Sequence, residues 1–155
     1  MTGPWWCFIS LAAGSASFGA ATVSAAESEL QAVQVVCGRC HAPAVFLKQT
    51  RSWERWNDVF ADMTKRGANG SEEQLARVTT YFLENLTLVN INTSPAEELA
   101  GVLGVRDDVA EAIITRRQIK LFANLAQLSE VPGVDPSKLE QRKSRILFGP
   151  EPTSP

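Results

Sequence analysis

The sequence predicts an all-α protein in which one small helical module is followed by a second of similar size. Three observations favour this class. Residues 52–66 place apolar side chains on one face at helical spacing. Residues 71–74, Ser-Glu-Glu-Gln, form a capping-box pattern at the start of another amphipathic segment. No segment shows the alternation of a half-buried strand, so a sheet is not expected.

Residues 1–25 have the pattern of an export signal. They contain no charged side chain, and small residues precede a cleavage point after Ala25 or Ala26. Glycine and serine interrupt the apolar stretch, whereas a spanning helix needs about 20 strongly apolar residues. We therefore expect a cleaved signal peptide and a periplasmic protein, with an uncleaved membrane anchor as the alternative.

A change of composition at residues 86–90 divides the rest of the chain. Most aromatic residues precede it, and the sequence after it contains two similar turns of the type helix–Gly-Val–helix. The expected parts are residues 26–88, residues 89–148 and a disordered tail at 149–155. Ser94 is expected to cap a helix whose first residue is Pro95. The expected helices span about 27–36, 52–66, 71–86, 95–103, 107–118 and 124–130, with a last one ending near 146.

The most specific motif is Cys37-Gly38-Arg39-Cys40-His41. This C-x-x-C-H spacing is that of covalent haem c, in which both thiols join the vinyl groups and the histidine binds the iron. A structural zinc site needs four nitrogen or sulfur ligands, and the expected mature chain offers only these three. A thioredoxin-like site needs a βαβ scaffold, which the sequence lacks. A plain disulfide remains a further alternative.

A haem at His41 would require a sixth ligand or leave the iron open. Met63 is the soft side chain available for this position, so it is expected as the second metal ligand. Lys48, Lys65 or a five-coordinate iron are the alternatives. Histidine and methionine ligation together favour electron transfer over catalysis.

Residues 27–88 resemble a short monohaem class I cytochrome c. The resemblance is carried by CGRCH, by the helical pattern W-x-x-W-x-x-V-F-x-x-M and by the run RGANGSEEQLARVTTYFLENL. It implies an electron carrier rather than an enzyme, with one haem c held by Cys37, Cys40, His41 and Met63. An open iron would instead imply a haem enzyme or sensor.

Residues 89–148 resemble the paired helix-hairpin-helix domain of competence-type DNA receptors, through VNINT, the 109–117 helix and the F-x-x-L-x-x-L-x-x-V-P-G-V pattern in 122–134. In that family the hairpins present backbone N–H groups to DNA phosphates. Here Arg106 and Asp135 replace the second glycine of each hairpin, and Asp107 and Asp108 follow the first replacement.

The charge balance does not favour nucleic acid. The whole chain has a net charge of −2, and residues 89–155 contain eight basic and nine acidic side chains. A local basic patch remains conceivable from Lys138, Arg142, Lys143 and Arg145. An extrinsic photosystem II subunit has the same resembled fold in a protein-docking role, which favours docking over DNA contact.

The sequence therefore predicts a periplasmic c-type cytochrome that transfers one electron at a time. Its helix-hairpin-helix module would dock it to a periplasmic redox protein or to a membrane electron-transfer complex. The alternative is a competence-type DNA-binding protein with a structural or regulatory haem.

Overall fold

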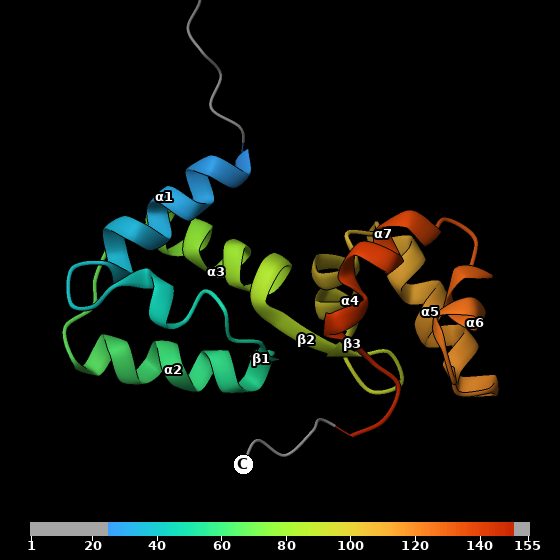
Figure 1. Cartoon of the computed structure of the whole chain (residues 1–155). Helices are drawn as coiled ribbons and strands as arrows, with labels where there is room; N and C mark the ends of the chain where they lie inside the picture. The colour runs from blue at the N-terminus through green and yellow to red at the C-terminus, as the bar shows by residue number, and fades with distance from the viewer. Residues whose placement is uncertain (1–24, 151–155) are drawn as a thin grey trace, which may run out of the picture.

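The computed structural model describes residues 25–150, which form two helical modules with a short strand, β2, between them (Figure 1). The predicted signal segment lies almost wholly outside these residues. The first module contains α1 (Ala25–Cys37), the 3-10 turn η1 (Pro43–Val45), β1 (Arg51–Ser52), α2 (Trp53–Lys65) and α3 (Glu72–Leu86). After β2 (Thr87–Asn90), the second contains α4 (Ala96–Leu103), α5 (Asp107–Ile119), α6 (Leu125–Ser129), α7 (Pro136–Arg142), the 3-10 turn η2 (Lys143–Arg145) and β3 (Ile146–Leu147).

The first module packs around aromatic rings. Trp56 of α2 is 1% exposed, and its ring meets Phe82 of α3 edge to face at 4.8 Å between centroids. Its indole Nε1–H donates to the carbonyl of Leu86 at 3.1 Å. Phe46 and Phe60 also contact the Phe82 ring, so one phenylalanine of α3 joins rings from two other segments. The predicted aromatic helix face is therefore the core of this module.

The predicted capping box at the start of α3 is confirmed. The backbone N–H of Gln74 donates to Ser71 Oγ at 3.2 Å, and the backbone N–H of Ser71 donates to Gln74 Oε1 at 3.0 Å. These two reciprocal bonds satisfy donors that have no partner inside the helix. The helix start is thus set by residues that the sequence alone identifies.

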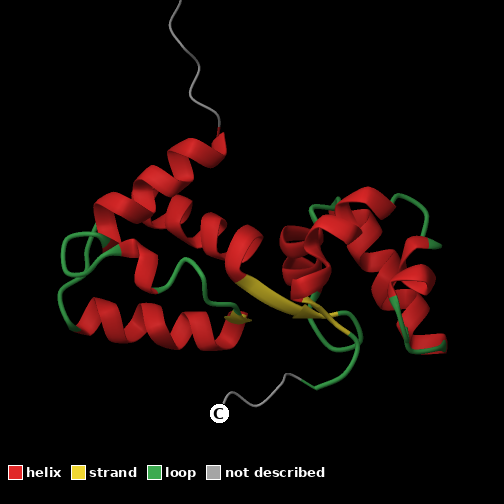
Figure 2. Ribbon diagram, in the orientation of Figure 1, coloured by secondary structure: helices red, strands yellow, loops and turns green. Residues whose placement is uncertain are grey.

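Three short parallel strands join the modules, in the order β1-β2-β3 (Figure 2). The first half of β2 pairs with β1, and its second half pairs with β3, where Val89 lies opposite Ile146. The sequence prediction of an all-α fold is correct for the mostly helical architecture but missed these strands. Two-residue pairings are too short to produce a detectable alternation of polar and apolar residues.

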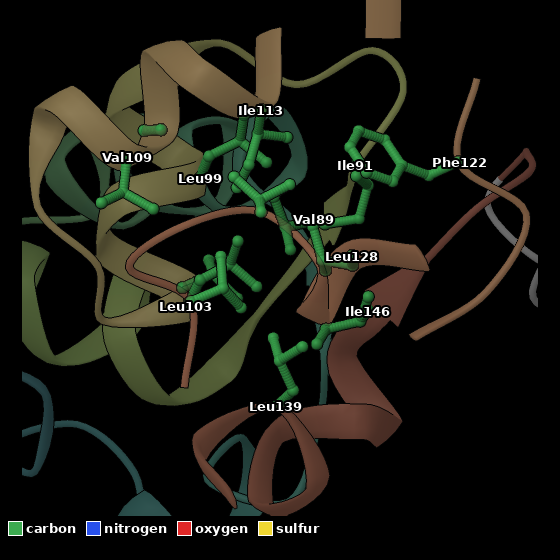
Figure 3. Packing of buried hydrophobic residues seen from close by; sticks show 14 residues of the cluster. Val89, Ile91, Leu99, Leu103, Val109, Ile113, Phe122, Leu128, Leu139 and Ile146 are labelled. Carbon is green, nitrogen blue, oxygen red and sulfur yellow. The ribbon is translucent and has the colours of Figure 1, made fainter. Parts of the chain in front are cut away.

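The second module has a largely aliphatic core. Leu99, Leu103 and Ile113 are fully buried, and their side chains lie together between α4 and α5 (Figure 3). The remaining members come from α4 and α5 themselves, from β2, β3, α6 and α7, and from the segments between these elements. Close contact continues into the first module, since a Cβ placed on Gly101 of α4 would lie 2.6 Å from Leu83 Cδ2 of α3. The two modules therefore pack directly against each other.

One predicted helix start is wrong by one residue. Pro95, not Ser94, occupies the N-cap of α4, and no side chain caps it. The Ser94 hydroxyl instead accepts from the backbone N–H of Asn90 at 3.2 Å. The serine thus stabilises the turn after β2. Sequence rules for helix starts do not consider this hydrogen bond. Among residues 25–150, no helix has the length and apolar character needed to cross a membrane.

Candidate nucleic-acid interface

The first hairpin connects α4 to α5 through Gly104, Val105 and Arg106. Gly104 adopts the left-handed conformation with φ of 63°, which a residue with a side chain rarely adopts. The backbone N–H of Val105 donates to the carbonyl of Ala100 at 3.1 Å and closes the end of α4. The chain then reverses, so the amino end of α5 begins directly after the turn.

The second hairpin connects α6 to α7 through residues 130–135. Gly133 has a φ of 90°, and the backbone N–H of Val134 donates to the carbonyl of Val131 at 3.1 Å. Asp135 is the N-cap of α7, and its Oδ1 accepts from the backbone N–H of Ser137 at 2.8 Å. The two turns therefore share a left-handed glycine followed by valine and a short helix entry.

Each hairpin glycine packs against the second helix of the other hairpin. A Cβ on Gly104 would lie 2.1 Å from Arg142 Nη1 of α7, and a Cβ on Gly133 would lie 2.6 Å from Val109 Cγ2 of α5. Arg142 Nη1 also donates to the carbonyl of Val102 at 3.2 Å. These reciprocal approaches hold the two hairpins as a pair. A side chain at Gly104 would require the flexible end of Arg142 to move, and one at Gly133 would press on Val109.

An ion pair lies at the entry to α5. Arg106 Nε and Nη2 donate to the two carboxylate oxygens of Asp108, at 2.9 and 2.5 Å. The hydrogen bond from Arg106 lowers the pKa of the Asp108 carboxyl below its usual range, and the backbone N–H groups of Val109 and Asp108 lower it further. The anion-attracting end of α5 therefore already holds a carboxylate of the protein itself.

Most other cations of the second module are engaged internally. Arg116 pairs with Glu130 at 2.5 Å, and Arg117 donates to the carbonyls of Ile91 and Ser94. Of the four residues considered as a conceivable patch, Lys143 pairs with Glu140, Arg142 contacts the first hairpin, and Arg145 is only 8% exposed. These four residues therefore do not form a patch of free cations.

Lys138 of α7 and Lys120 after α5 are the exceptions among the basic residues of this module. Both are exposed, and neither forms an ion pair within residues 25–150. Lys138 lies in α7, three residues after the Asp135 that begins this helix. Lys120 lies at the opposite end of α5 from the first hairpin. Among the described basic residues of this module, Lys138 is therefore the one free cation close in sequence to a hairpin.

The residues predicted to hold a cofactor lie in the first module. Cys37, Cys40, His41 and Met63 border one cavity of about 640 Å³, together with the rings of Phe46, Trp56, Phe60 and Phe82. Cys40 and His41 are exposed, while Cys37 is half-buried and burial raises the pKa of its thiol. The structure thus brings the four predicted residues to one cavity.

These residues do not form a cluster of metal-ligating groups. Within residues 25–150, no group of three or more His, Cys, Asp and Glu side chains lies together so that it could hold a metal ion. His41 instead places its ring edge to face with Phe46, at 5.6 Å between centroids. The predicted ligation by His41 and Met63 thus stays a prediction from sequence.

Residues 84–147 match the helix-hairpin-helix motif family. The second module is therefore a helix-hairpin-helix domain, as the paired hairpins indicate. A stretch of 60 residues, 38% of this chain, is 42% identical to ComE operon protein 1 of Bacillus subtilis (strain 168). The matched stretch covers 29% of that relative. No solved structure matches the chain.

These findings contradict the predicted cytochrome. The family match and the relative lie on the helix-hairpin-helix module and favour the DNA-binding alternative over an electron carrier. The predicted haem c, its iron and the one-electron transfer have no support from either comparison, and the described residues contain no group of three or more His, Cys, Asp and Glu side chains that could hold a metal ion. The main sequence prediction was therefore wrong, and the docking to a redox partner that followed from it is likewise unsupported.

Proposed function

We propose that this chain is a DNA-binding protein of the competence type, and that it acts by binding rather than by catalysis. The observation that carries the proposal is the pair of hairpins held together by the reciprocal packing of Gly104 and Gly133. The family match over residues 84–147 and the similarity to a ComE operon protein support it.

The hairpins suit the DNA backbone better than base edges. Each turn brings the amino end of a helix to the surface, where backbone N–H groups and the helix dipole attract phosphate oxygens. Phosphate contacts position a protein on the duplex without reporting its sequence. The proposed binding is therefore independent of base sequence.

Lys138 is the side chain assigned to a phosphate. It is exposed on α7 and no acidic group among the described residues neutralises it. The other cations near the hairpins are held by carboxylates or carbonyls of the protein. We expect weak binding, with a dissociation constant of about 10⁻⁴ to 10⁻⁶ M at physiological salt, as for other sequence-independent contacts.

We also propose that the protein works outside the cytoplasm. The support is the uncharged apolar sequence of residues 1–25 with small residues before the expected cleavage point. In that location the protein would meet DNA that enters the cell from outside.

The proposal is tested by fluorescence anisotropy with a fluorescein-labelled 20-base-pair duplex. The wild type is expected to bind at 50 mM salt and to lose affinity steeply as salt rises, because phosphate contacts release counterions. Lys138→Gln is expected to weaken binding about threefold and to reduce the salt slope by about 0.9.

The matched control is Lys120→Gln, which removes the same charge from the opposite end of α5. It is expected to change the affinity by less than half as much. Absence of binding by the wild type at 50 mM salt would overturn the proposed function. Equal effects of the two substitutions would show that Lys138 of α7 does not make the phosphate contact.

A further inference from the structure

The first hairpin contains an exposed ion pair at the start of its second helix. Arg106 and Asp108 are both exposed, with 80% and 64% of their side-chain surfaces accessible. The guanidinium binds both carboxylate oxygens, so its two nearest donors are occupied by the protein. The only arginine of this turn is therefore neutralised where it faces solvent.

The same carboxylate places a negative charge in the first turn of α5. The backbone N–H of Val109 in this turn donates to the carbonyl of Arg106 at 3.0 Å. A phosphate approaching these groups would meet a negative charge already bound there. The second hairpin repeats the pattern, because Asp135 Oδ1 accepts from the backbone N–H of Ser137.

Resting on the proposed function, we propose that Asp108 is an affinity-determining residue that keeps Arg106 from DNA phosphates and adds a repelling charge at the amino end of α5. The ion pair is exposed, and exposed pairs are weak and easily exchanged. Loss of the carboxylate therefore frees a cation and removes a negative charge without unfolding the turn. The result is tighter binding by a protein that has lost one carboxylate.

The test compares Asp108→Asn with Asp107→Asn in the full chain. Both remove one negative charge from the first turn of α5, but Asp107 has no ion pair with Arg106. Asp108→Asn is expected to tighten binding to the 20-base-pair duplex about fivefold at 50 mM salt and to steepen the salt slope by about 0.9. Asp107→Asn is expected to tighten it about twofold at most.

A double-mutant cycle with Arg106→Gln separates the freed arginine from the lost charge. In the wild-type background, Arg106→Gln is expected to change affinity less than twofold, because Asp108 already holds the guanidinium. In the Asp108→Asn background, it is expected to remove most of the gain. Asp108→Ser provides a second neutral variant that helix amino ends accept, in case the asparagine variant does not fold.

The outcomes distinguish this inference from the proposed function. If the wild type binds and Asp108→Asn binds no tighter than Asp107→Asn, the inference is wrong and DNA binding stands. Equal effects of Arg106→Gln in both backgrounds would also overturn it. If neither the wild type nor any variant binds the duplex at 50 mM salt, both proposals fail.

Discussion

The two modules differ in what fills their interiors. The first is built on rings, with Trp56 and Phe82 buried and further aromatic residues packed against them. The second is built on leucine, isoleucine and valine, with Phe122 as its one buried aromatic residue among those described. The ring-rich module leaves a cavity of about 640 Å³ beside its core, while the aliphatic module positions two turns. The module with the more conspicuous sequence motif is thus not the one that the comparisons identify.

The largest expected effect tests the aliphatic core. Ile113→Ala removes a fully buried side chain and is expected to lower the free energy of unfolding by about 2–5 kcal/mol. Ile119→Ala on the same helix is the matched control, because Ile119 is 85% exposed, and it is expected to change stability by about 0.5 kcal/mol or less. Urea denaturation followed by far-ultraviolet circular dichroism measures both. Similar losses for the two variants would contradict the packing of α5.

The next effect compares a glycine of each module. Gly133→Ala introduces a methyl group into the contact with Val109 at a φ of 90°, and a loss of about 2–3 kcal/mol is expected. Gly67→Ala imposes a similar backbone conformation, with φ of 99°, but no atom lies within 4 Å of the added group. About 1 kcal/mol is expected there. The difference between the two losses, measured by thermal unfolding, is the cost of crowding Val109. Equal losses of stability for the two variants would show that this contact contributes nothing.

A smaller effect tests the aromatic core. Trp56→Phe keeps a ring but leaves the carbonyl of Leu86 without the indole donor, and a loss of about 1–2 kcal/mol is expected. Trp53→Phe is the control, because Trp53 is only half-buried. If the modules unfold together, Trp56→Phe shifts the whole circular-dichroism transition. If they unfold separately, it shifts only the part that belongs to the first module.

The smallest effect lies where the modules meet. Burial raises the pKa of Glu98 on α4, and nearby Glu97 and Glu54 of α2 raise it further, while the Ser94 hydroxyl lowers it. Because the pKa is higher in the folded state, the stability present at low pH falls as pH rises through that pKa. Glu98→Gln is therefore expected to stabilise the protein by about 0.5 kcal/mol at pH 7 and to have no such effect near pH 4. Denaturation at the two pH values checks this, and an equal effect at both would refute it.

Local signals in the sequence were sufficient for the helices. The apolar face of 52–66 and the capping box at Ser71 are properties of short segments, and both predict elements that the structure contains. The two Gly-Val turns likewise indicated paired hairpins. Features of this kind depend on neighbours three or four residues away, which the sequence displays directly.

Contacts between distant segments could not be predicted in the same way. The pairing of Val89 with Ile146 and the approach of Arg142 to Gly104 depend on tertiary packing. Burial of Arg145 removed a charge from the conceivable basic patch for the same reason. The motif Cys37–His41 was specific in sequence but led to a functional prediction that the comparisons contradict.

The placement of β3 has a consequence for how the chain assembles. Ile146 and Leu147, near the carboxyl end, pair with the strand that follows α3. During synthesis the aromatic core of the first module can form while the ribosome is still making α5. The pairing of β2 with β3 can form only after β3 has left the ribosome. A shortened chain ending before Ile146 would thus lack β3, the strand that pairs with β2.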